Sequence, residues 1–141
     1  MTENCPDPAQ ISARFVELGY VDDEAYARSR SGGLLRRGFG PRRVSQDLYA
    51  AGIDEQIRSD LAPDEGAIRN AALAMARKRR FGPFSKGELA LDPKQAQDRK
   101  RKQIAAMLRA GHGFDTVSAI MDARSAAAAA DWAAEAQDED V

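Results

Sequence analysis

The chain is rich in alanine, and no stretch of strand length alternates apolar with polar residues. Its 141 residues include 27 alanines but only 13 β-branched residues, counting Ile, Val and Thr together. Alanine has the highest helix propensity, whereas β-branched side chains favour strands. Leu, Ile, Val and Phe occupy only 25 positions, which is a lean supply for a hydrophobic core. The sequence therefore predicts an all-α fold of one domain or two small modules.

Helix start and stop signals divide the chain into short segments. Proline or an acidic residue opens most of these segments, and glycine ends most of them. Gly32 and Gly33 lie inside one expected helix, where they lower its stability and permit a bend or unusually close packing. Residues 125–141 are Ala-rich and then acidic, a composition that predicts a frayed helix and a solvated tail. The expected helices cover residues 8–18, 23–37, 41–51, 54–61, 64–80, 93–110 and 114–121.

An internal repeat emerges when each residue is compared with the one 73 positions later. Over residues 28–50, eight of 23 positions are identical, and in both copies a basic helix ending in Gly-x-Gly precedes a short helix. Chance alignment of two helical hairpins rich in Ala and Arg is the alternative. We interpret the pattern as two tandem helical modules, residues 7–62 and 63–124. The identical pairs are Arg28/Arg101, Leu35/Leu108, Arg36/Arg109, Gly38/Gly111, Gly40/Gly113, Val44/Val117, Ser45/Ser118 and Ala50/Ala123.

Common catalytic and metal-binding motifs are absent from the sequence. Cys5 is the sole cysteine and His112 the sole histidine, so neither has a partner for a disulfide, a zinc site or a catalytic triad. We therefore expect no enzymatic activity, no metal and no cofactor. No apolar run approaches the roughly 18 residues that cross a bilayer, so we expect no membrane contact and a cytoplasmic location.

Two turns between glycines invite a functional interpretation. His112 lies between Gly111 and Gly113, and we interpret it as a turn residue rather than a catalyst. The segment GFGP at residues 38–41 precedes a helix and could cradle a phosphate at the helix N-terminus. We favour the alternative, in which this segment is a tight turn between helices, packed by Phe39.

The basic residues are concentrated in two regions, although the formal net charge of the chain is -1. Six arginines and no acid lie between Arg28 and Arg43, and residues 69–109 contain 12 bases against three acids. A solvated helix face usually mixes charges at i,i+4 spacing, whereas these runs are nearly unmixed. We therefore predict contact with a polyanion or an acidic protein surface. The candidate contact residues are Arg28, Arg30, Arg36, Arg37, Arg42, Arg43, Arg77, Lys78, Arg79, Arg80, Arg99, Lys100, Arg101, Lys102 and Arg109.

Several blocks of the sequence are distinctive when taken together. Residues 19–28 read GYVDDEAYAR, residues 36–44 read RRGFGPRRV, and Leu48 with AGI at 51–53 continues the pattern. Three blocks follow in the second half: RKRRFG at 77–82, DRK at 98–100 and LRAGHGF at 108–114. Together these blocks resemble the RecX family of RecA regulators, and the resemblance covers residues 11–123.

The resemblance implies an elongated array of tandem three-helix modules that lodges against the RecA filament on single-stranded DNA. It implies that residues 7–62 correspond to the middle repeat of the family and residues 63–124 to the last one. It also implies inhibition of RecA without catalysis, and roles in the regulation of recombination, in DNA repair and in the SOS response. Members usually carry another repeat before the GYVDDE block, so we expect most of the usual first repeat to be missing here.

A second interpretation uses the same basic residues. In this alternative, the protein is a stand-alone helical nucleic-acid-binding protein whose arginines contact backbone phosphates without any recombinase. Few aromatic residues are available to stack on bases, which weakens the case for sequence-specific RNA recognition.

Overall fold

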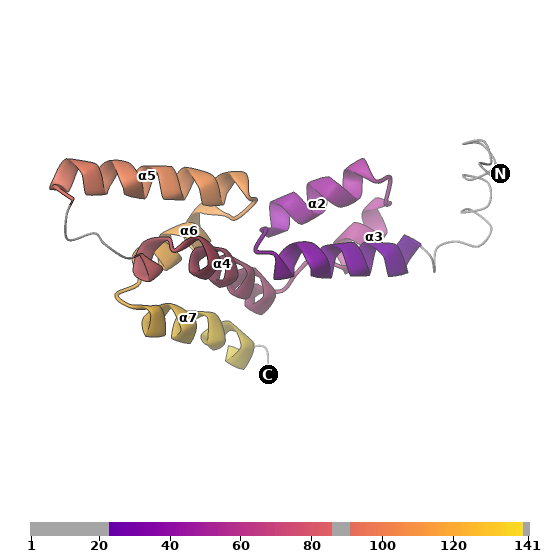
Figure 1. Ribbon diagram of the computed structural model, residues 1–141. Coiled ribbons are helices and arrows are strands. Elements are labelled where there is room, and N and C mark those ends of the chain that lie inside the picture. The colour runs from indigo at the N-terminus through magenta and orange to yellow at the C-terminus, as the bar shows by residue number, and fades with distance from the viewer. Residues whose placement is uncertain (1–22, 86–90, 140–141) are drawn as a thin grey trace.

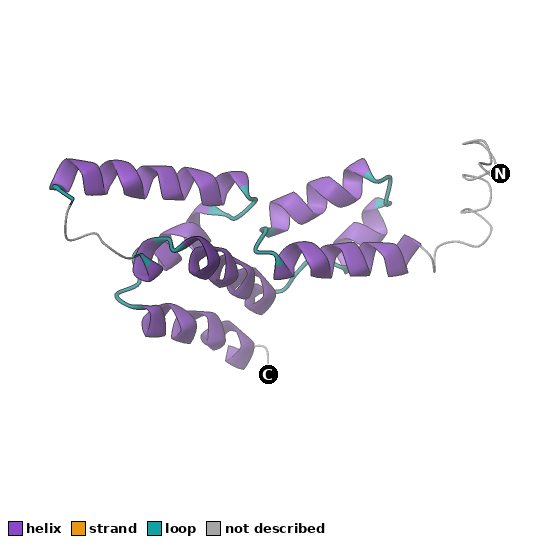
Figure 2. Ribbon diagram, in the orientation of Figure 1, coloured by secondary structure: helices purple, strands orange, loops and turns teal. Residues whose placement is uncertain are grey.

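The computed structural model describes residues 23–85 and 91–139 of the chain. Within these ranges every regular segment is helical and no residue lies in a strand, which confirms the expected all-α fold (Figure 2). The expected helix over residues 8–18 lies outside the described ranges. A helix over residues 23–36 comes first. The elements that follow are α2 (Pro41–Ala50), α3 (Glu55–Asp60), α4 (Glu65–Arg79), the 3-10 helix η1 (Gly82–Phe84), α5 (Pro93–Arg109), α6 (Phe114–Met121) and α7 (Ala126–Glu139).

Aspartate caps begin three of these helices. The side chains of Asp54 and Asp64 accept hydrogen bonds from the backbone N–H three residues later, at 3.1 and 2.8 Å. At the start of α5, Asp92 and Gln95 form a reciprocal capping box. Each cap satisfies a donor that a helix start leaves unpaired. Such local signals explain why the expected helix ends between residues 23 and 121 agree with the structure to within one residue.

The helix over residues 23–36 packs with α2 and α3 around a small apolar core (Figure 1). Val44 and Leu48 are one helical turn apart on α2 and are almost completely buried, as the i,i+4 spacing of an amphipathic helix predicts. The helix over 23–36 continues through its two glycines without interruption. The buried members of this first core are Ala27, Leu34, Val44, Leu48, Ile53 and Ile57.

The second half of the described chain is organised around α4, against which α6 and α7 pack (Figure 1). Met107 from α5 and both Val117 and Ile120 from α6 are fully buried in this second core. Six other members are alanines, whose small side chains allow the helices to approach one another closely. The remaining buried members are Ala72, Leu73, Met75, Ala76, Phe81, Ala106, Ala110, Met121, Ala129 and Ala133.

Residues 126–139 form the helix α7, so the expectation of a frayed helix and solvated tail is wrong over this range. Ala129, Ala133 and Ala136 are completely or almost completely buried. Their spacing of four and three residues places them on one helical face. The segment contains few large apolar residues, so its composition does not predict burial. Close packing on α4 instead uses small side chains, which this segment supplies.

Arg69 of α4 fixes α7 in place. Its Nη1 donates a hydrogen bond to the carbonyl oxygen of Trp132 at 2.7 Å, and its guanidinium lies 4.8 Å from the centroid of the indole ring. Its Nε donates to Glu65 at 2.8 Å. The side chain of Arg69 is only 18% exposed, so this arginine serves the fold.

The two copies of the internal repeat end their first helix in the same way. Gly38 and Gly111 have φ angles of 96° and 100°, in the left-handed region that favours glycine. In each copy, the N–H of the glycine donates to the carbonyl oxygen three residues earlier, and the next N–H donates to the one five residues earlier. This is the Schellman pattern of helix termination. The sequence alignment therefore matches equivalent structural positions.

The two turns meet where the C-terminal end of α5 approaches the start of α2 (Figure 1). The N–H of Gly40 donates to the carbonyl oxygen of Ala110 at 2.8 Å, and the N–H of Arg42 donates to that of Gly111 at 3.1 Å. Gly40 has no side chain with which to cap α2. The carbonyls of the two residues that follow α5 therefore satisfy donors at the start of α2. We call this contact the junction.

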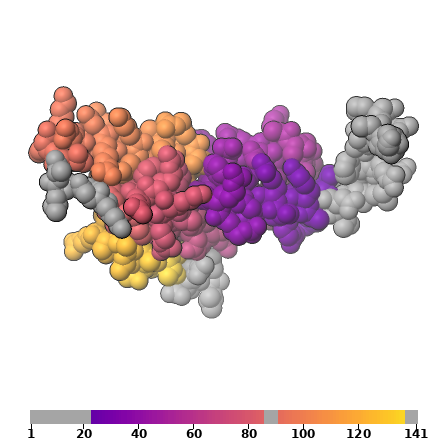
Figure 3. Space-filling view, in the orientation of Figure 1, coloured from indigo at the N-terminus to yellow at the C-terminus, as the bar shows by residue number. Residues whose placement is uncertain are grey.

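The boundary between the expected modules, 7–62 and 63–124, stays a prediction. The two separate cores support it, and in the space-filling view the first described segment, coloured indigo to purple, lies at one end of the described molecule (Figure 3). Because α7 contributes to the second core, we propose that the second module continues to the end of α7.

Replacing Gly32 and Gly33 together by alanine is expected to raise the free energy of unfolding by about 1 to 2 kcal/mol, because glycine weakens a helix interior. Among the described residues, and apart from the helix's own backbone, a Cβ at either position meets only the terminal atoms of the Arg36 side chain, at 3.1 and 3.9 Å, and that side chain can move. Urea denaturation of both proteins measures the difference. A less stable variant would contradict the expectation.

Gly40→Ala is expected to destabilise the protein by about 1 to 3 kcal/mol, since overpacking a fixed contact costs this much. A Cβ at Gly40 would lie 2.4 Å from the backbone of Gly111, which cannot move without opening the junction. Gly113→Ala is the matched control, because Gly113 is the equivalent N-cap in the repeat and a Cβ added there would meet no described atom within 4 Å. Equal losses in the two variants would show that the junction does not form in solution.

Candidate basic interface

The fifteen predicted contact residues lie on the helix over 23–36, the turn after it, the start of α2, the end of α4 and along α5. Thirteen of them are exposed, and Arg43 and Arg99 are partly buried. Exposure is what a docking surface requires. The ion pairs and ring contacts of each residue then separate side chains that serve the fold from those available to a partner.

Asp47 on α2 binds two of the six arginines in the first basic region. Arg30 Nη2 donates to Asp47 at 2.7 Å, and Arg43 Nε donates at 3.4 Å. The hydrogen bond from Arg30 lowers the pKa of Asp47 below its ordinary value, against the effect of burial. Arg28 pairs with Glu24 at 2.8 Å. Three arginines of this unmixed run are therefore paired, because acids that lie outside the run in sequence are close to them in space.

The second basic region is also partly compensated. Lys100 pairs with Asp122 at 3.1 Å, and Arg101 lies 4.0 Å from Asp98. Lys100 and Arg99 line a cavity beside η1 rather than the junction. The structure thus does not bring the basic residues of α5 near 99–102 together with those of the first region.

Nine of the fifteen side chains form no ion pair with any residue that the structure describes. They come from both modules and include the last turn of α4, where cations also compensate the helix dipole. These nine, which we call the unpaired bases, are Arg36, Arg37, Arg42, Arg77, Lys78, Arg79, Arg80, Lys102 and Arg109.

The phosphate-cradle interpretation of residues 38–41 is wrong, and the tight turn is confirmed. The N–H groups of Gly40 and Arg42 donate to the carbonyl oxygens of Ala110 and Gly111, so they are not available to an anion. Phe39 packs against both cores, and the guanidinium of Arg43 lies 4.6 Å from the centroid of its ring.

His112 lies within the junction and is 2% exposed. Its Nε2 lies 2.8 Å from the carbonyl oxygen of Gly38, so Nε2 carries the hydrogen and donates it. Nδ1 is buried without a hydrogen-bond partner among the described residues. Burial lowers the pKa of His112, and the hydrogen bond to Gly38 partly opposes this effect. The turn interpretation is confirmed, but no signal in the sequence indicated that this turn joins the modules.

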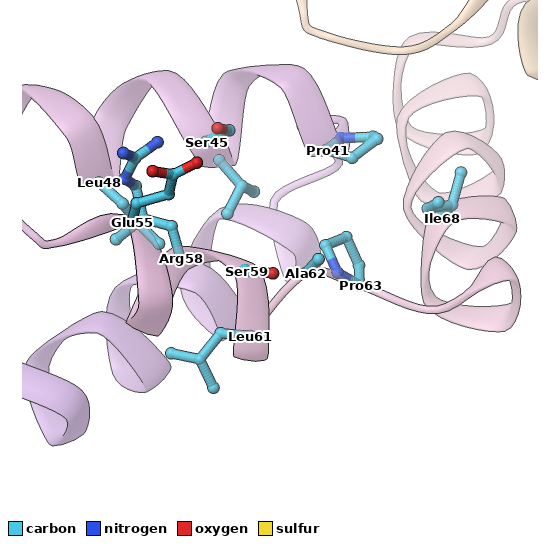
Figure 4. Close-up of a pocket in the computed structure, with 11 residues that line it drawn as sticks. Pro41, Ser45, Leu48, Glu55, Arg58, Ser59, Leu61, Ala62, Pro63 and Ile68 are labelled. Atoms are coloured by element: carbon cyan, nitrogen blue, oxygen red, sulfur yellow. The ribbon is translucent and has the colours of Figure 1, made fainter.

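A cavity of about 450 Å³ runs along α2 and α3 and is mainly apolar (Figure 4). Of the described residues in its lining, only Glu55 and Arg58 are charged. The described residues contain no group of three or more His, Cys, Asp or Glu side chains placed to hold a metal ion. Among the described helices, none combines the length and apolar character needed to cross a membrane.

The fold and the unpaired bases define an all-α repeat protein that exposes a set of cations on several of its helices. The profile of RecX, second three-helix domain, matches residues 22–60, which contain the helix over 23–36, α2 and α3. Regulatory protein RecX of Myxococcus xanthus is 29% identical over 119 residues, covering 82% of this chain and 61% of the relative. Regulatory protein RecX of Neisseria meningitidis serogroup A is 37% identical over 105 residues, covering 72% and 58%. That of Mycobacterium sp. (strain JLS) is 34% identical over 121 residues, covering 82% and 61%.

The chain belongs to the RecX family. It spans about three fifths of the length of the curated relatives it matches. No solved structure gave a significant match.

The stability of the protein is expected to fall as the pH drops below about 6.5, because His112 is the sole histidine and its pKa is lowered in the folded state. Below that pH the unfolded chain binds more protons than the folded one, so the loss reaches at most about 1.4 kcal/mol per pH unit until the folded pKa is reached. Urea denaturation between pH 7.5 and 5 measures this slope. His112→Phe should flatten it, and an unchanged slope in that variant would refute the assignment.

Proposed function

We propose that this protein binds the filament of a RecA recombinase on single-stranded DNA and lowers its activity without catalysing a reaction. Membership of a family whose matched relatives are called regulatory proteins supports this proposal. The observation that carries it is the set of unpaired bases, drawn from both modules. The proposal places the protein in the cytoplasm, in the regulation of recombination, DNA repair and the SOS response.

The electrostatics of the unpaired bases fit such a partner. A filament on DNA is an extended polyanion, and each phosphate that a base neutralises releases counterions. A site spread over two modules engages successive parts of a repeating partner. In this proposal Arg30 and Arg43 serve the fold of the first module through Asp47, while the unpaired bases contact the filament.

A second candidate function is nucleic-acid binding without a recombinase. Tyr49 is 70% exposed. The guanidinium of Arg58 lies 5.2 Å from the centroid of the Tyr49 ring. Exposed aromatic rings beside cations are the platforms on which single-stranded bases stack.

The two functions are separated by measuring ATP hydrolysis by the cognate recombinase on single-stranded DNA, with and without this protein at one salt concentration. A regulator lowers the rate at a concentration below that needed to coat bare DNA. A stand-alone binder lowers it only when it saturates the DNA itself. An unchanged rate at saturating protein would overturn the proposal.

Reversing Arg36 and Arg42 to Glu is expected to abolish the inhibition while the helical content is retained. Neither side chain forms an ion pair among the described residues, so its loss leaves no buried charge behind. If DNA is contacted, the log-log salt dependence flattens by about 0.7 for each lost phosphate contact. The matched control reverses Lys94 and Arg124, which are exposed bases outside the proposed set. Full inhibition by the folded Arg36/Arg42 variant would remove these residues from the interface.

A further inference from the structure

A small pocket lies where the two modules meet. Its volume is about 200 Å³, and its lining is supplied by the turn after the helix over 23–36, the last turns of α4 and the end of α5. Phe39, Met75 and Ala110 form apolar walls, whereas Arg37, Lys78 and Arg79 supply three cations, and none of the described acids lines it. Since one water occupies about 30 Å³, the pocket holds a group of several heavy atoms together with water.

The local charge of this junction pocket is positive. Three helices end near it, and each helix C-terminus contributes roughly half a negative charge. The sum of about one and a half negative charges is smaller than the three positive charges of the side chains. Two of the nearby backbone acceptors are also used, because the carbonyl oxygens of Gly38 and Ala110 accept hydrogen bonds across the junction. The pocket therefore favours an anion.

The two guanidinium groups are held in place by aromatic rings. Arg37 lies 5.2 Å from the ring centroid of Phe39, and Arg79 lies 4.9 Å from that of Phe81. A ring contact engages the face of a guanidinium and leaves its N–H edge able to donate. These side chains are thus partly ordered in the free protein, so they lose less conformational entropy when a ligand binds.

We propose that the junction pocket binds one backbone phosphate of single-stranded nucleic acid, with Arg37, Lys78 and Arg79 as donors. Three cations that converge from two elements suit the tetrahedral oxygens of a phosphate better than a planar carboxylate, which one guanidinium satisfies. This inference rests on the proposed function and deepens it, because the strand then contacts both modules at once. The phosphate site exists only while the junction is closed.

The test measures binding of fluorescein-labelled dT20 by anisotropy at one salt concentration. In the variant Lys78→Gln/Arg79→Gln, the dissociation constant is expected to rise at least tenfold, and the salt dependence to flatten by about 0.7 for each lost phosphate contact. The control Lys94→Gln/Arg124→Gln removes two exposed bases away from the pocket and should stay within threefold of the parent. Circular dichroism checks the fold, and the single change Lys78→Gln replaces the double variant if that variant unfolds.

A 20-residue polyglutamate peptide provides the second arm, because it carries carboxylates instead of phosphates at a similar charge. The proposal is supported if the affinity for dT20 falls in the pocket variants but not in the control, and if the parent binds the peptide more weakly than dT20. Equal dT20 binding by the parent and the pocket variants overturns it, as does absence of dT20 binding by the parent. If the parent binds the peptide as tightly as dT20, and Lys78→Gln weakens both equally, the pocket is a carboxylate site instead.

The recombinase assay keeps the two proposals apart. If the parent inhibits ATP hydrolysis while the pocket variants bind dT20 as well as the parent does, only the phosphate site fails. If the parent has no effect on the recombinase but its binding of dT20 depends on the pocket, the proposed regulation fails and the phosphate site stands.

Discussion

The arrangement of the molecule depends on one backbone contact, in which the two carbonyls just after α5 accept hydrogen bonds from N–H groups at the start of α2. The sequence leaves α2 without a cap of its own, because Gly40 has no side chain and the next residue is proline, which has no N–H. An approach this close requires glycine on both sides, at Gly40 and Gly111. The same contact buries His112 and places Phe39 between the cores, so it also determines which basic side chains come together.

Local sequence signals predicted the helices well, because the residues that begin and end a helix act within a few positions. Asp92 with Pro93 is a signal of this kind, and so are Gly38 and Gly111, which follow the helix over 23–36 and α5. Pairing between distant residues could not be predicted in this way. Asp47 lies outside the run of arginines, and nothing in the sequence indicates that Arg30 on another helix would reach it. The sequence can rank residues by charge, but only the fold shows which charges are already paired.

The same limit explains why the C-terminal segment was predicted wrongly. Large apolar residues usually mark a buried helix, and residues 126–136 contain only one, Trp132. Burial there depends on alanine methyl groups recurring at helical spacing opposite α4 and on the contact between Arg69 and Trp132. The spacing of Ala129, Ala133 and Ala136 is visible in the sequence, but it predicts burial only when another helix is known to lie close to this face.

The junction also has a consequence for the order in which the protein is made. The oxygen that caps Gly40 belongs to Ala110, which is added 70 residues later in the sequence. At a synthesis rate of about 5 to 20 residues per second, the first module emerges from the ribosome roughly 4 to 14 s before the residue that completes it. During this interval the start of α2 and one side of Phe39 face water or a chaperone. The first module is thus completed by a backbone carbonyl that is synthesised 70 residues later.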